Sequence, residues 1–248
     1  MMHNSPKITV ITVCYNAVSE IECTILSVIN QLYTNIEYII VDGASTDGTL
    51  DIIKKYSAKI SILISEPDKG IYDAMNKGLK LASGEWINFM NAGDCFSDNN
   101  VLNSIFSLEI PSNKSFLYSD IYSRKKNGHY YINIMNVTEH ECKLVHQSVI
   151  YRKCLHDEYG YYAVTNKIIV SDYLFFLRVP IDQIMKINTI IAKYAAFGIS
   201  EQGLWCLQQS CCADVVFRKR SFWTMIIRYI LIRIKSIIIP RRINELLK

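Results

Sequence analysis

The first ninety residues alternate short, β-branched apolar runs with stretches in which apolar residues recur every three or four positions. An unbroken apolar run is typical of a buried strand, and the longer spacing is typical of a helix. The expected strands cover residues 8–14, 37–41, 60–64 and 85–90, and the expected helices cover residues 20–32, 50–56 and 71–82. This alternation predicts an α/β fold with a mostly parallel central sheet and helices on both of its faces.

Polar clusters follow each of the four expected strands. Tyr15 and Asn16 follow the first strand, Asp42 follows the second, Asp68 lies in the loop beyond the third, and residues 91–94 follow the fourth. Ligands bind at the carboxyl ends of the strands in sheets of this kind. The pattern therefore predicts a binding site built from four loops at one edge of the sheet.

The second half of the chain is less regular. We expect strands at residues 115–122, 129–134 and 149–151 and a helix at residues 172–178. An apolar stretch at residues 221–239 then carries three cations, Arg228, Arg233 and Lys235, which make a membrane-spanning helix costly. Its pattern predicts an amphipathic helical tail that lies at a lipid interface, with a core or dimer helix as the alternative.

Charge supports the interfacial interpretation of this tail. The chain has a net charge of +4, but residues 215–248 contain nine basic residues against Glu245 alone, so the rest of the chain is mildly acidic. The overall balance is too mild for a nucleic-acid binder. The basic tail predicts contact with an anionic membrane surface.

Several familiar signatures are missing from the sequence. No G-x-G-x-x-G follows the first expected strand and no P-loop motif occurs, which argues against a dehydrogenase or a P-loop enzyme. The eight cysteines show no C-x-x-C spacing, which argues against a zinc or redox site. The N-terminus lacks the build of a signal peptide, so we expect a cytoplasmic location.

Four motifs, in order, resemble the nucleotide-binding half of family 2 glycosyltransferases with the GT-A fold, in the branch that builds bacterial surface polysaccharides. They are TVITVCYN at 9–16, IVDGASTDGT at 40–49, SEPDKGIYDAMNKG at 65–78 and NFMNAGD at 88–94. Weaker similarity continues at residues 146–147 and 171–173. The resemblance implies a GT-A domain over residues 1–214, with a nucleotide-binding half (1–95) and an acceptor-binding half (96–214), followed by a membrane-associating tail (215–248).

The resemblance implies a nucleotide site at the first four loops. Tyr15 would pack on the base, Thr12 would line the same pocket, and Asp42 would accept a hydrogen bond from uracil, which would be charge-assisted. Asp68 would face the base or the ribose, and Asn91 would contribute as an outer partner of the metal. From the residues alone, Asp42 is also explained as a turn or helix-capping carboxylate, and Asp68 as part of an ordinary turn.

The resemblance also implies a metal site and a catalytic base. Family members usually carry an acidic triplet where this chain has residues 91–94, and only Asp94 keeps a carboxylate there, so Asp94 is the expected ligand of Mn or Mg. Asp172 matches the base that takes the proton of the acceptor hydroxyl. His146 would contact the diphosphate or the acceptor. The alternatives are a plain turn for Asp94, a helix N-cap for Asp172 and a partly buried loop histidine for His146.

The resulting hypothesis is an inverting glycosyltransferase on the inner face of the bacterial inner membrane. It would move one hexose, glucose or galactose, from a UDP-sugar to a polyprenyl-diphosphate-linked saccharide during O-antigen or capsule assembly. Nucleotidyl transfer to a sugar phosphate would need a basic Gly-rich loop after the first strand, which the chain lacks. A membrane-attached sugar-nucleotide binding or scaffold protein without transfer activity remains the alternative.

Overall fold

The computed structural model describes residues 5–125, 127–165, 167–194, 204–217 and 219–238. A seven-stranded sheet consists of β1 (Ile8–Cys14), β2 (Ile36–Asp42), β3 (Ile62–Ser65), β4 (Trp86–Phe89), β6 (Phe116–Tyr118), β11 (Val149–Arg152) and β12 (Ile184–Lys186). Its order is β12-β6-β11-β4-β1-β2-β3, and only β11 runs antiparallel to its neighbours. The expected mostly parallel sheet is confirmed.

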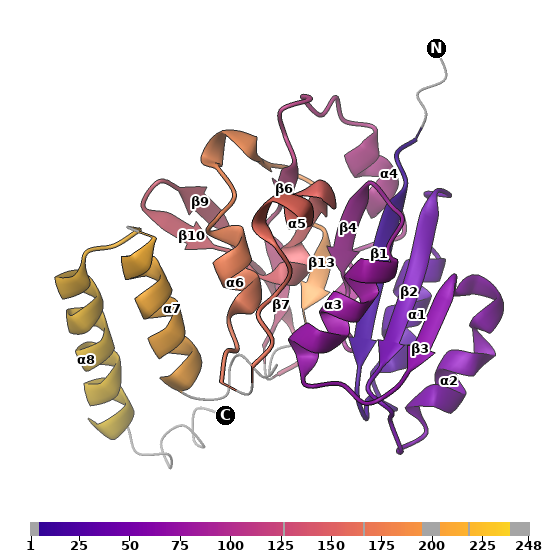
Figure 1. The fold of residues 1–248 in the computed structure, drawn as a ribbon, viewed down its shortest axis with the longest axis horizontal. Coiled ribbons are helices and arrows are strands. Elements are labelled where there is room, and N and C mark those ends of the chain that lie inside the picture. The colour runs from indigo at the N-terminus through magenta and orange to yellow at the C-terminus, as the bar shows by residue number, and fades with distance from the viewer. Residues whose placement is uncertain (1–4, 126, 166, 195–203, 218, 239–248) are drawn as a thin grey trace.

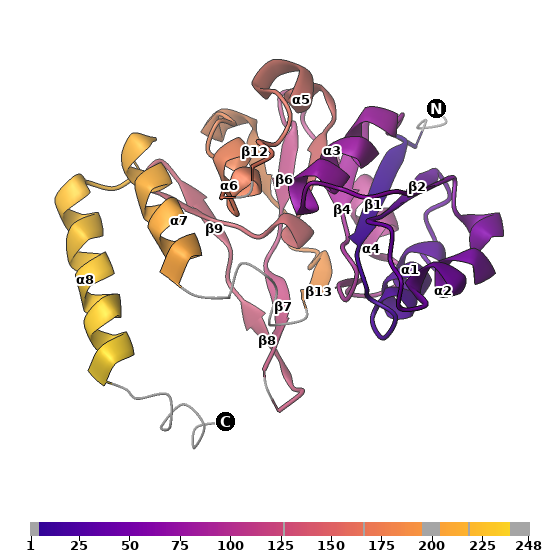
Figure 2. The same cartoon turned by 60° about the horizontal axis from the view of Figure 1, so that its bottom comes forward.

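Helices cover both faces of this sheet, as the sequence predicts. The first six are α1 (Ile21–Ile29), α2 (Thr49–Lys55), α3 (Ile71–Leu81), α4 (Val101–Phe106), α5 (Cys154–Tyr159) and α6 (Ser171–Phe176). Figures 1 and 2 show α3 and α1 on opposite faces of the central strands. Every residue of β1 is buried between them, which explains its unbroken apolar run.

The strand register aligns the loops that follow β1 to β4. Cys14 pairs with Asp42, and Asp42 pairs with Ser65, so β1, β2 and β3 end at the same level. Beyond β4, the Ala92 amide donates to the Val13 carbonyl at 3.2 Å. The four polar loops therefore gather at one edge of the sheet.

One predicted strand is wrong. Residues 115–122 form β6 and β7 (Ile121–Arg124), which belong to different sheets. The strand is interrupted at Ser119 and Asp120, whose polar side chains bond to residues of other segments. The Ser119 hydroxyl accepts the Ile191 amide at 2.9 Å, and the Asp120 carboxylate lies 2.7 Å from the Lys186 ammonium.

Two smaller sheets complete the second half. A four-stranded sheet has the order β5-β13-β7-β8, with β5 (Cys95–Phe96), β8 (Tyr130–Asn133) and β13 (Ala192–Tyr194), and a two-stranded sheet consists of β9 (Asn136–Thr138) and β10 (Glu141–Lys143). Three 3₁₀ turns, η1 (Ser57–Lys59), η2 (His146–Ser148) and η3 (Ile181–Gln183), connect elements. The turn η2 leads into β11 and lies at the edge that carries the polar loops.

The last described residues form two helices, α7 (Leu204–Val216) and α8 (Phe222–Ile238), which confirm a helical tail. They lie side by side at the end of the molecule away from β3 (Figures 1 and 2). Among the described residues, no helix combines the length and apolar character needed to cross a bilayer. Helix α7 continues across the expected boundary between residues 214 and 215, and this boundary stays a prediction. Residues 239–248 of the expected tail lie outside the described residues.

Candidate active site

The loops after β1 and β2 hold each other in an unusual backbone conformation. Asn16 and Ala44 have positive φ angles of 48° and 61°, a region that costs energy for residues other than glycine. The Asn16 amide donates to Ser45 Oγ at 2.8 Å, and the Thr46 amide donates to Asn16 Oδ1 at 2.9 Å. These bonds offset the strain and fix both loop tips at the sheet edge.

Tyr15 and Asp68 come together over Gly43. A Cβ atom on Gly43 would lie 2.6 Å from Asp68 Oδ2 and 3.2 Å from Tyr15 Cδ2, so the close approach of these side chains requires glycine. The Tyr15 side chain is 64% exposed. An open aromatic ring beside a carboxylate can stack on a base and accept hydrogen bonds, in line with the predicted nucleotide contacts.

Thr12 and Asp42 lie beneath these loops and are fully buried. The Thr12 hydroxyl donates to the Met90 carbonyl at 2.7 Å. The Asp42 carboxylate accepts the Ser45 amide at 3.1 Å and the Ser65 hydroxyl at 2.7 Å. These contacts support the alternative role of Asp42 as a loop-organising carboxylate, and direct nucleotide contact by Thr12 or Asp42 stays a prediction.

The loop after β4 presents Asp94 toward η2. The Thr24 hydroxyl of α1 donates to the Asp94 carbonyl at 2.7 Å and accepts the Gly93 amide at 3.0 Å. The Asp94 side chain is buried, and its Oδ2 accepts the Gln147 side-chain amide at 2.7 Å. Thr24 therefore fixes the backbone of this loop, and Gln147 fixes the Asp94 carboxylate.

The oxygen atoms at Asn91, Asp94 and Gln147 are of the kind that a hard divalent cation prefers. Asn91 Oδ1 and Gln147 Oε1 are buried without a hydrogen-bond partner. Carboxylate and amide oxygens are the ligands that Mg prefers, and Mg often keeps only one or two protein carboxylates beside phosphate oxygens. In the described part of the chain no three His, Cys, Asp or Glu side chains come together as a metal site. The protein alone thus offers one carboxylate and two amide oxygens.

Asp172 lies in the first turn of α6, and three donors fix its carboxylate. The Tyr72 hydroxyl donates to Oδ1 at 2.8 Å, the Tyr173 amide donates to Oδ1 at 2.9 Å, and His146 Nδ1 lies 3.3 Å from Oδ2. Burial acts to raise the pKa of Asp172, but the hydrogen bonds from His146, Tyr72 and Tyr173 hold the pKa below its usual value. The carboxylate is ionised at neutral pH and can accept a proton.

His146 joins the base to the loop after β4. The Asn91 side-chain amide lies 2.8 Å from His146 Nε2 and, in this orientation, donates to it, so Nδ1 carries the proton that faces Asp172. The next residue, Gln147, contacts Asp94. Adjacent residues of η2 therefore connect the expected base with the expected metal ligand, and Asn91, Asp94, His146 and Asp172 form one cluster.

Two residues that contact this cluster, Tyr72 and Gln147, have no role assigned from the sequence. Tyr72 lies inside the third motif and Gln147 directly follows His146, so both lie in segments that the family resemblance covers. Their partners lie 100 and 53 residues away along the chain, and no local pattern indicates such pairs.

Comparison with known proteins supports the family. A family model described as glycosyl transferase family 2 matches residues 9–174. A PGL/p-HBAD biosynthesis glycosyltransferase of Mycobacterium bovis is 27% identical over 205 residues, which are 78% of this chain and 78% of that protein. The putative teichuronic acid biosynthesis glycosyltransferase TuaG of Bacillus subtilis is 39% identical over 97 residues, 38% of each chain.

Solved structures share the fold. The chain is similar to S. aureus TarS 1–349 in complex with UDP, with a TM-score of 0.68 and 20% identity; the match covers 85% of this chain and spans 65% of that one. It is also similar to the mannosyltransferase PcManGT from Pyrobaculum calidifontis in complex with GDP-Man and Mn²⁺, with a TM-score of 0.65 and 19% identity over 84% of this chain and 62% of that one. These likenesses confirm the GT-A fold. Because the family model covers well over half of the sequence and the fold agrees, the chain belongs to glycosyl transferase family 2.

Proposed function

We propose that this glycosyltransferase transfers one hexose, glucose or galactose, from a UDP-sugar to a polyprenyl-diphosphate-linked saccharide, with inversion at the anomeric carbon. The product would enter a bacterial surface polysaccharide such as O-antigen or capsule. The observation that carries this proposal is the Asp172 carboxylate. Tyr72 and His146 hold it in a fixed position, and the adjacent residues His146 and Gln147 connect it with Asp94.

Inversion in a single displacement needs a base on the side opposite the leaving group, which takes the proton of the attacking hydroxyl. Asp172 has the required properties, because its pKa is low enough for it to be ionised and its position is fixed by neutral donors. Asn91 keeps the His146 proton on Nδ1, where it orients the carboxylate. The proton of the acceptor hydroxyl would pass to Asp172.

Asp94, Asn91 and Gln147 would form the site of the donor's diphosphate. A Mg or Mn ion there would neutralise the charge that grows on the departing UDP. Asp94 would bind the ion, and the unpartnered oxygens of Asn91 and Gln147 would orient its hydration shell or the sugar hydroxyls. Gln147 would keep the Asp94 carboxylate turned toward the site.

The relatives support the choice of donor and pathway. TarS is solved with UDP and with UDP-GlcNAc, and the curated relatives are named for PGL/p-HBAD and teichuronic acid biosynthesis. The solved mannosyltransferase instead carries GDP-Man, so a donor screen must include other nucleotides.

The outward side of α8 supports a location at the inner face of the cytoplasmic membrane. Trp223, Ile227 and Ile230 follow one another at helical spacing and are 72%, 57% and 48% exposed. Arg228 and Arg233 are exposed and flank this stripe. Such a helix suits the interface of an anionic bilayer, with the apolar stripe among the lipid chains and the cations at the head groups.

A donor screen tests the function. Purified protein is incubated with UDP-, GDP- and dTDP-sugars and a synthetic GlcNAc- or GalNAc-diphosphate-lipid acceptor, with Mn or Mg against EDTA, and the product is identified by mass. We expect transfer from one UDP-sugar that EDTA stops. UDP binding without transfer or hydrolysis, from any donor, would instead establish the scaffold alternative.

A further inference from the structure

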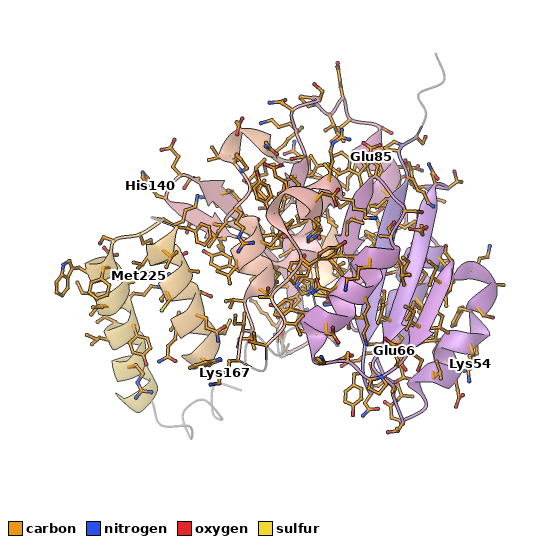
Figure 3. All side chains as sticks on the ribbon, viewed as in Figure 1. Lys54, Glu66, Glu85, His140, Lys167 and Met225 are labelled. Carbon is orange, nitrogen blue, oxygen red and sulfur yellow. The ribbon has the colours of Figure 1, made fainter. Side chains whose placement is uncertain are left out.

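An apolar groove of about 870 Å³ lies between α6, α7 and α8, outside the cluster of Asp94 and Asp172. Its walls include Val170 and Leu174 at α6, Trp205 and Val216 of α7, and Met225 of α8. Figure 3 shows Met225 between α7 and α8, and Lys167 beside the lower end of α7. The volume is within the range of sites that bind small molecules.

Four uncharged polar side chains that line this groove, those of Trp205, Gln208, Gln209 and Tyr229, are already hydrogen-bonded. The Gln208 side-chain amide donates to the Tyr229 hydroxyl at 2.7 Å, and Trp205 Nε1 donates to the Lys167 carbonyl at 2.8 Å. Gln209 Oε1 accepts the Ile169 amide at 2.9 Å. The surface left over is hydrocarbon, which binds an apolar chain more favourably than water.

Among the described residues that line the groove, one is charged, Lys167. Lys167 is exposed, and its ammonium makes no ion pair with any residue that the structure describes. A hydrocarbon groove with an open cation at one end complements an amphiphile that has an apolar chain and an anionic head group. The head group chemistry that fits is a phosphate ester.

The groove shares walls with the candidate active site. Val170 and Leu174 are four residues apart and lie on one side of α6, whereas Asp172 lies between them on the other side, toward Tyr72. Helix α6 thus has the groove on one side and the expected base on the other.

We infer that this groove binds the apolar chain of a lipid-phosphate acceptor, with the Lys167 ammonium on the phosphate and the attached saccharide reaching around α6 to Asp172. The inference rests on the proposed function and adds to it a site for the part of the acceptor that does not react. The groove takes the segment of chain next to the phosphate, and the rest of the chain would remain in the bilayer beside α8.

Titration calorimetry with alkyl phosphates tests the groove without any donor. The probes are butyl phosphate, undecyl phosphate below its micelle concentration, undecanol and inorganic phosphate. Each buried methylene improves binding about fourfold, so undecyl phosphate should bind at least about 100-fold more tightly than butyl phosphate even if part of the chain stays exposed. Inorganic phosphate should not bind measurably, and K167Q should remove the preference for undecyl phosphate over undecanol.

A matched pair of variants separates the groove from the outer surface of α7 and α8. Val216 lines the groove and Trp223 does not, yet both are highly exposed, at 75% and 72%, so neither substitution should prevent folding. V216E should weaken undecyl phosphate binding at least about 10-fold, because a carboxylate would lie against the alkyl chain. W223E should leave this binding unchanged, and circular dichroism should show both proteins folded.

Equal affinity for the two chain lengths, or an equal loss in V216E and W223E, would overturn the inference. A dimer that V216E converts to monomer, without chain binding in either protein, would show instead that a second copy covers the groove. Transfer to a butyl-diphosphate saccharide with the same KM as to the undecyl compound would refute the groove and leave the proposed function standing. Undecyl phosphate binding without sugar transfer would support the groove and refute the proposed function.

Discussion

Removing the Tyr72 hydroxyl should change the pH dependence of sugar transfer. Tyr72 is 8% exposed, and its hydroxyl donates to Asp172 Oδ1 at 2.8 Å. Burial and the nearby charge of Asp172 raise the pKa of Tyr72, so the phenol remains a proton donor throughout the physiological range. Y72F keeps the ring, which packs against Tyr162 at a centroid distance of 5.7 Å, and deletes only the hydrogen bond.

The size of the effect follows from this bond. A hydrogen bond to a charged group contributes about 1.5–3 kcal/mol, and one pKa unit corresponds to about 1.4 kcal/mol. The bond stabilises the ionised form of Asp172, so its loss should raise the pKa of that carboxyl by about one to two units. The His146 and Tyr173 contacts remain, which favours the lower end of this range.

The assay is the pH profile of kcat/KM, whose acid limb reports the base in the free enzyme. In Y72F the acid limb should move to higher pH by about one unit, while UDP affinity, measured by calorimetry, stays the same. Tyr56 offers a matched control, because its hydroxyl donates to Glu22 Oε1 at the same distance of 2.8 Å on the far side of the sheet from α3. An unmoved acid limb in Y72F, or the same movement in Y56F, would refute the reasoning.

Four further predictions concern other residues. D172N should lower kcat by about 10²- to 10⁴-fold with UDP binding intact, and retained turnover would contradict its role as base. D94A should make any residual transfer insensitive to EDTA; a full, metal-stimulated rate would show a turn residue only. Burial lowers the pKa of His156 from 6.5 to about 4, so between these pH values the unfolded chain binds a proton that the folded chain excludes. The free energy of unfolding should therefore fall by about 3 kcal/mol as the pH falls from 6.5 to about 4. H156Q should remove this slope in urea titrations, and an unchanged slope would assign it elsewhere. Replacing Trp223 and Ile227 together by Glu should abolish co-sedimentation with vesicles that contain anionic lipid; unchanged co-sedimentation would place the membrane contact elsewhere.

Part of the active-site cluster can be predicted from the sequence. The sequence predicts roles for Asn91, Asp94, His146 and Asp172, and the structure brings all four together. Their mutual contacts were not accessible, because each depends on side chains that meet only after β4, η2 and α6 have packed. The same applies to Asp42, whose carboxylate proves to be occupied by serine donors from its own loop and from β3.

Local sequence patterns are sufficient to predict β1 to β4, α1 to α3 and the sheet edge at which their loops meet. An unbroken apolar run favours a strand that is buried on both sides, as β1 and β4 are, and helical spacing gives one apolar face. Tertiary structure alone decided the break at Ser119, the antiparallel β11, the Tyr72–Asp172 bond and the groove beside α7. Each of these arises from hydrogen bonds or packing between segments far apart in the chain, whose free energy depends on three-dimensional proximity that no local spacing of residues encodes.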